Sequence, residues 1–94
     1  MSKAADYAVV YDISSNRERS RVAKLLKGFG FRIQQSVFEC RLDRKGKRDL
    51  LRELRALDIE TGFVKVYKLE HSFKPRQIGE KQDPGIDDDS ALII

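Results

Sequence analysis

The chain has 94 residues, with 19 Lys and Arg against 15 Asp and Glu, a net charge of +4, and a single cysteine. This length supports one domain with a thin core, and a lone cysteine excludes an intrachain disulfide and fits a reducing compartment. No apolar run approaches membrane-spanning length and the start carries no apolar signal segment, so we expect a cytoplasmic protein without membrane contact.

Charge divides the chain near Glu70. Residues 1–70 carry 16 Lys and Arg against 10 Asp and Glu, whereas residues 71–94 carry 3 against 5. The basic part suggests a polyanionic partner, although such an excess is also typical of a solvated surface. We therefore expect a core domain over residues 1–70 and a tail over residues 71–94.

The stretch from Tyr7 to Tyr11 is β-branched and aromatic, which is typical of a strand. Both of its faces are apolar, so it requires cover on both sides. Asp12 follows directly and, by period two, continues the face of Ala8 and Val10. A carboxylate at a strand end is often only a turn former, and a catalytic or metal-binding role is the alternative.

The segment Ser15–Glu18 fits a capping box, in which the Ser hydroxyl caps a helix and the Glu side chain reaches back to the cap. An apolar stripe with helical spacing follows, made of Val22, Leu25, Leu26 and Phe29. We therefore predict an amphipathic helix directly after the first strand.

Phe31–Leu42 has extended character and is either one long strand or two short ones broken near Gln35–Ser36. A second helix follows, with a buried stripe of Leu50, Leu51, Leu54 and Leu57. Phe63–Leu69 then alternates as a final strand. With a hairpin in the middle, the order is βαββαβ, an α+β ferredoxin-like sandwich. Two helices cover only one face of such a sheet, so we expect a homodimer with facing sheets.

The tail holds two apolar segments, Arg76–Gly79 and Ala91–Ile94, with an acidic run at residues 87–89 between them. The acidic run is typical of a solvated loop. A free tail would rarely expose four apolar residues at its end. We therefore predict extra strands that dock on the dimer mate or on another protein.

The usual metal and nucleophile motifs are absent from the sequence: it has no CxxC, HExxH or P-loop, and Cys40 is expected to be a small buried apolar residue. Lys27–Phe31 resembles the start of an RNA-recognition motif, but the residues after it do not continue that pattern. Asp12 is the remaining candidate. One carboxylate binds Mg²⁺ weakly, and a twofold dimer could bring two Asp12 side chains together. Phosphate contacts would come from nearby arginines, namely Arg17, Arg19, Arg21 and Arg32.

Four segments, taken together, resemble the CRISPR-associated Cas-two family: Tyr7–Ser14, Arg19–Leu26, Arg32–Glu39 and Gly62–Leu69. The resemblance covers residues 7–69 and, more loosely, the tail. It implies a ferredoxin-like homodimer and a phosphodiesterase that depends on Mg²⁺ or Mn²⁺ and acts on single-stranded RNA or duplex DNA. It further implies a role beside the Cas-one integrase in spacer acquisition.

The resemblance also assigns residues. Asp12 matches the metal-binding and catalytic aspartate, and the basic positions near the active site match Arg19, Arg21 and Arg32. Ser36 and Phe38 match a Ser-Val-Phe motif, and Tyr11 would line the site. Three functions stay open: a metal-dependent endonuclease, a non-catalytic DNA-binding adaptor of the integrase complex, and a toxin-like ribonuclease of the same fold.

Overall fold

Six elements follow one another in the computed structural model, which describes residues 3–70 and 78–79. They are β1 (Ala5–Ile13), α1 (Asn16–Leu26), β2 (Gly30–Gln34), β3 (Val37–Leu42), α2 (Arg44–Ala56) and β4 (Gly62–Leu69). The predicted α+β class and the order βαββαβ are confirmed.

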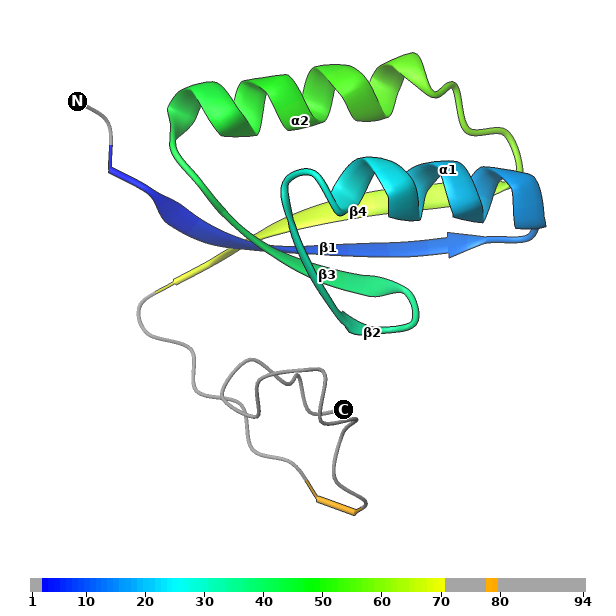
Figure 1. Cartoon of the computed structure of the whole chain (residues 1–94), viewed down its shortest axis with the longest axis horizontal. Coiled ribbons are helices and arrows are strands. Elements are labelled where there is room, and N and C mark those ends of the chain that lie inside the picture. Colours follow the sequence, from blue (N-terminus) through cyan, green and yellow to red (C-terminus); the bar gives the residue numbers. More distant parts are fainter. Residues whose placement is uncertain (1–2, 71–77, 80–94) are drawn as a thin grey trace.

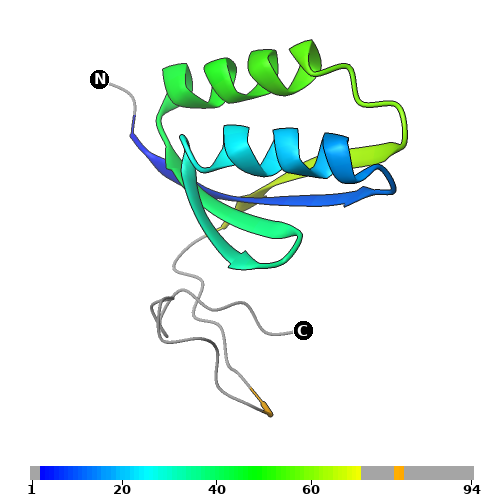
Figure 2. The same cartoon turned by 45° about the vertical axis from the view of Figure 1, so that its right-hand side comes forward.

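The strands form one antiparallel sheet in the order β2-β3-β1-β4, with β1 paired to β3 on one side and to β4 on the other. The middle of the chain is a hairpin, since β2 and β3 pair across a turn at Gln35–Ser36. Both helices lie on the same side of this sheet (Figures 1 and 2). The opposite face is open within the part of the chain that the structure describes.

Each helix begins at a polar cap. Ser15 Oγ accepts a hydrogen bond from the Glu18 amide at 3.2 Å, as predicted, and Asp43 Oδ1 accepts one from the Gly46 amide at 2.7 Å. The predicted core contact of Phe29 is confirmed, but Phe29 lies after the end of α1 and not on its stripe. The helix ends at Leu26, and Phe29 packs partly buried against the core from the following turn.

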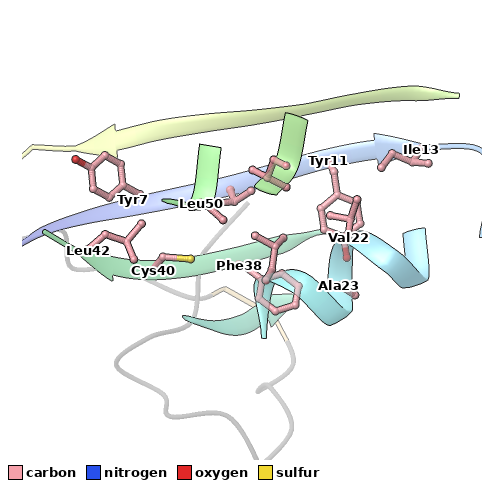
Figure 3. Packing of buried hydrophobic residues seen from close by; sticks show 12 residues of the cluster. Tyr7, Tyr11, Ile13, Val22, Ala23, Phe38, Cys40, Leu42 and Leu50 are labelled. Carbon is pink, nitrogen blue, oxygen red and sulfur yellow. The ribbon is translucent and has the colours of Figure 1, made fainter. Parts of the chain in front are cut away.

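The core lies between the sheet and the two helices. Its side chains come from β1, β3, α1 and α2 (Figure 3), and those that are fully buried include Val9, Val22, Leu26, Phe38, Cys40 and Leu50. The prediction for Cys40 is confirmed: burial, followed by the charge of Glu39, raises the pKa of its thiol to about 11. Period two on β1 and β3 thus gives one continuous apolar face under the helices.

The open face has apolar character of its own. Ala8, Ile33 and Val37 are buried but lie outside the cluster beneath the helices. Phe63 and Tyr67 of β4, which pair with Asp12 and Ala8 of β1, are 44% and 50% exposed. A sheet face that leaves large aromatic side chains half-exposed is typical of an interaction surface.

The predicted tail strands fall largely outside the described residues. Ala91–Ile94 and residues 76–77 lie beyond them, and Ile78 and Gly79, which are described, are not in a strand. Among the described helices, neither is long and apolar enough to cross a membrane.

Candidate nucleic-acid and metal site

Asp12 lies next to the end of β1, and its side chain is exposed. Its neighbours Tyr11 and Ile13 are buried in the core, so the alternation of strand side chains directs Asp12 to the open face. Period two predicted this orientation from the sequence. Across the ladder Asp12 lies opposite Phe63. The carboxylate therefore borders the half-exposed aromatic side chains of β4.

A single chain provides few ligands for a metal ion. Among residues 3–70 and 78–79, no three His, Cys, Asp or Glu side chains come together in a group that could hold one. Mg²⁺ usually keeps several waters and uses one or two carboxylates together with phosphate oxygens. The exposed Asp12 fits such an open site as one ligand.

The turn after Asp12 is held by Arg19. Its Nη1 atom donates to the carbonyl oxygens of Ile13 at 2.6 Å and Ser14 at 2.8 Å. These two carbonyls lie at the point where β1 ends and the chain turns into α1. Arg19, which the sequence assigned to phosphate contact, therefore stabilises the backbone directly after the candidate aspartate.

Glu18 ties the first turn of α1 to the segment that precedes β4. Its carboxylate accepts hydrogen bonds from the amides of Glu60 at 2.9 Å and Thr61 at 3.0 Å, and from the Thr61 hydroxyl. The hydroxyl of Thr61 and the amide of Glu60 hold the pKa of Glu18 below its ordinary value. The predicted return of Glu18 to the amide of Ser15 is wrong, because that amide donates to Thr61 Oγ1 at 3.0 Å instead.

Gly62 allows β4 to approach Asp12. Its φ of +153° is a conformation that glycine favours, and a Cβ atom there would lie 1.9 Å from the carbonyl oxygen of Asp12. The sequence signal was a glycine at the start of a strand, which often marks close backbone approach. In the register Gly62 lies opposite Ile13, next to the pair of Asp12 and Phe63, and this pairing is not visible in the sequence.

Three of the expected site residues, Tyr11, Arg32 and Phe38, stack on one another on the helical side of the sheet. The guanidinium carbon of Arg32 lies 5.3 Å from the centre of the Phe38 ring, and the rings of Phe38 and Tyr11 lie 6.4 Å apart. The Tyr11 hydroxyl donates to the carbonyl of Gln35, and its amide donates to the carbonyl of Ser36, each at 3.1 Å. Tyr11, Phe38 and Ser36 thus fix the hairpin turn against β1.

Between α1 and β2 runs a groove of about 610 Å³. We call it the α1–β2 groove, and its lining residues are Tyr11, Asn16, Arg19, Ser20, Ala23, Lys24, Lys27, Arg32 and Gln35. Four of these side chains are cationic and none is acidic. Asp12 is not among them. The structure therefore brings Arg19 and Arg32 together with two lysines, on the opposite side of the sheet from the candidate aspartate.

The remaining arginines lie elsewhere on α1. Arg17 is exposed in the first turn, and Arg21 is exposed beside Lys24 in a hollow between the ends of α1 and α2. Sequence reasoning did not single out Lys24 or Lys27. The signal for them was present, since residues 20, 24 and 27 share one helix face beside the apolar stripe.

These features define a small α+β domain with an exposed acid at one strand end and a basic groove beneath its first helix. The family model described as CRISPR associated protein Cas2 matches residues 6–74. The chain belongs to this family, which is the Cas-two family of the resemblance.

Two relatives illustrate the similarity. A CRISPR-associated endoribonuclease Cas2 of Thermus thermophilus is 53% identical over 62 residues, which are 65% of this chain and 66% of that protein. A protein of the same name from Mycobacterium tuberculosis is 39% identical over 61 residues, 65% of this chain and 54% of that protein. The match thus spans about half the length of the M. tuberculosis relative.

Solved structures show the same fold. A crystal structure of Cas2 superposes with a TM-score of 0.76 at 30% identity and covers 87% of this chain and 94% of that one. A hypothetical protein from Thermus thermophilus gives 0.72 at 35% identity, covering 82% and 95%. Streptococcus pyogenes Cas2 gives 0.63 at 30% identity, covering 68% and 84%.

Proposed function

We propose that this chain is a metal-dependent phosphodiesterase that acts on nucleic acid as a homodimer of ferredoxin-like sandwiches. In the dimer the open sheet faces meet, and the two Asp12 carboxylates form one site. The names of the two relatives, both CRISPR-associated endoribonucleases, support the reaction class. The proposal includes RNA and duplex DNA, because hydrolysis of a phosphodiester requires the same groups in either.

The observation that carries the proposal is the position of Asp12 on the face of the sheet opposite the helices (Figure 1), beside large aromatic side chains of β4. Phe63 lies directly opposite it and Tyr67 lies further along the same strand, both about half-exposed. Burying such side chains against a second copy is favourable by roughly 25 cal/mol for each Å² of apolar surface. A twofold axis through this face would give each Asp12 a second carboxylate from the partner.

Mg²⁺ or Mn²⁺ is the proposed cofactor. A divalent ion bound there would neutralise charge on the phosphate and activate a water molecule. The contribution of the chain itself is ligation by Asp12 and neutralisation of neighbouring phosphates by Arg17, which is exposed in the first turn of α1. Arg19 and Glu18 position Asp12 indirectly, since they hold the turn that follows it.

The decisive experiment compares wild type with Asp12→Asn on labelled RNA and duplex DNA, in Mg²⁺ and in EDTA. We expect the variant and the EDTA samples to lose cleavage while folding and dimerisation persist. Asp58→Asn is the matched control, because Asp58 is exposed and its φ of +52° suits Asn. Undiminished cleavage by a contaminant-free Asp12→Asn preparation would refute the proposal.

A non-catalytic adaptor is the second candidate. It is favoured by the lack of a ligand group for a metal among the described residues of one chain. In this case the dimer holds duplex DNA in spacer acquisition and the tail binds the Cas-one integrase. Deletion of residues 83–94, which lie outside the described residues, should abolish integrase binding and spare the dimer. Retention of the integrase by the truncated protein would contradict this assignment.

A further inference from the structure

We propose that the α1–β2 groove is a separate site that binds the phosphate backbone of nucleic acid. It lies across the sheet from Asp12, so it would stay accessible when the open faces pair. The inference rests on the proposed function only in taking nucleic acid as the ligand. It requires neither cleavage nor a metal ion.

The charge of the groove indicates an anion. Lys24, Lys27 and Arg32 are all exposed at its edges, and no ion pair joins them to an acid within residues 3–70 and 78–79. Asn16 and Ser20 add uncharged hydrogen-bonding groups to the α1 wall. Cations without acidic neighbours in a concave surface are typical of sites that bind phosphate.

The shape of the groove indicates an extended ligand rather than a single ion. The α1 wall runs from Asn16 to Lys27, a distance of about 16 Å at a helical rise of 1.5 Å per residue. One strand of a duplex advances about 3.4 Å along the duplex axis for each phosphate, so a wall of this length can contact more than one phosphate. Lys24 and Lys27 lie one turn apart along it and could contact different phosphates.

The floor of the groove indicates recognition of the backbone and not of the bases. Tyr11 is only 3% exposed and its hydroxyl is already bonded to Gln35, and the face of Phe38 is covered by Arg32. Binding of unpaired bases usually requires exposed aromatic rings on which they stack. Among the residues that line the groove no such ring is available, so binding should be indifferent to sequence.

The test uses a double substitution, Lys24→Gln with Lys27→Gln, in the full chain. Affinity for duplex and single-stranded oligonucleotides is measured in EDTA over a range of salt concentrations. Each phosphate contact contributes about 0.9 to the slope of log K against log salt for duplex DNA and about 0.7 for single strands. We expect the slope for duplex DNA to be smaller by about 1.8 in the double Gln variant. The double variant Lys24→Arg with Lys27→Arg should keep the slope of the wild type, because it keeps both charges.

The matched control is Arg44→Gln with Arg48→Gln, which removes equal charge from exposed positions of α2 outside the groove. A smaller loss of slope in the control supports a defined site. An equal loss in both variants would overturn it, because the protein would then respond only to net charge. Inorganic phosphate is also added as a competitor of the oligonucleotide. If it displaces the oligonucleotide more strongly than a chloride salt at the same ionic strength, the groove binds a single anion and the proposal is overturned.

The same measurements are repeated on the Asp12→Asn background. We expect an unchanged loss of slope there, because the groove and Asp12 lie on opposite faces of the sheet. If cleavage proves absent while the groove variants still weaken binding, the proposed nuclease fails and the groove stands. If cleavage depends on Asp12 but the groove variants bind like wild type, the proposed nuclease stands and the groove site is refuted.

Discussion

Glu18 and Thr61, 43 residues apart in the sequence, are joined directly: the amide and the hydroxyl of Thr61 both donate to Glu18 Oε1. The Ser15 amide completes the link by donating to the same hydroxyl oxygen. The start of α1 is thereby tied to the residue that precedes β4. The link therefore holds together the end of β1, which carries Asp12, and the start of β4, which pairs with it.

This link makes stability depend on pH. The pKa of Glu18 is lower in the folded chain than its ordinary value of 4.5, so ionised Glu18 stabilises the fold above about that pH, and this contribution is lost as pH falls through the folded pKa. Glu18→Gln should therefore lower the melting temperature at neutral pH. The gap to wild type should close in acid, as measured by calorimetry. Glu53→Gln, on the exposed surface of α2, is the control. A gap that is independent of pH would contradict the assignment.

Gly62→Ala should be strongly destabilising. A methyl group would overlap the carbonyl of Asp12, and the positive φ adds strain, so we expect a loss of at least about 3 kcal/mol in the free energy of unfolding. Gly28→Ala is the control, since a Cβ there would lie 3.4 Å from the carbonyl oxygen of Leu25. Its effect should stay below about 1 kcal/mol in denaturant titrations. Similar losses for both variants would refute the steric argument.

Arg19→Ala and Arg17→Ala remove the same charge two residues apart and should differ in stability. Arg19 donates to two carbonyls, and its loss should cost about 1 to 3 kcal/mol. Arg17 is exposed, so its loss should stay within about 0.5 kcal/mol and should instead weaken nucleic-acid binding. Denaturant titrations and binding measured side by side give both values. Equal stability of the two variants would show that the Arg19 hydrogen bonds contribute little.

Tyr67→Lys should dissociate the proposed dimer. The ring is half-exposed on the open face, opposite Ala8, and a charge at this position would have to be desolvated at the interface. Light scattering should give the mass of one chain, and circular dichroism should remain that of a folded protein. Ala56→Lys, exposed on α2, should leave the mass unchanged. Dissociation by the α2 substitution alone would place the interface on the helical side.

The Cys40 thiol should resist alkylation in the native chain. Its pKa of about 11 leaves little thiolate near neutral pH, and the side chain is fully buried. A thiol reagent at about pH 8 should react slowly with folded protein and rapidly after unfolding in guanidinium. Fast reaction in the native state would show that β3 is accessible to solvent.

Local patterns were sufficient to predict most of the elements. Helical spacing in α1 and α2 and alternation in β1 and β4 each arise within one segment, so burial follows from sequence neighbours alone. The Ser15 cap was predictable for the same reason. The middle of the chain was ambiguous because period two is the same for one long strand and for a hairpin, and only the pairing of β2 with β3 decides between them.

The site was less predictable because its contacts join distant segments. Period two correctly placed Asp12 on the open face, but nothing local shows that Glu18 bonds Thr61 rather than Ser15. Proximity in sequence also grouped Arg19 and Arg32 with Asp12. In the fold they line the groove beneath α1, because α1 lies on the helical side and Arg32 stacks on a core ring.

The central position of β1 has a consequence for biosynthesis. β1 is made first, yet one of its two neighbours is β4, and Asp6 pairs with Leu69 near the end of the sheet. Contacts this distant in sequence form late, because the loop-closure entropy must be overcome first. On the ribosome, therefore, a nascent chain can close the α1 and β2–β3 half while one edge of β1 stays unpaired. Folding can finish only after Leu69 has left the exit tunnel.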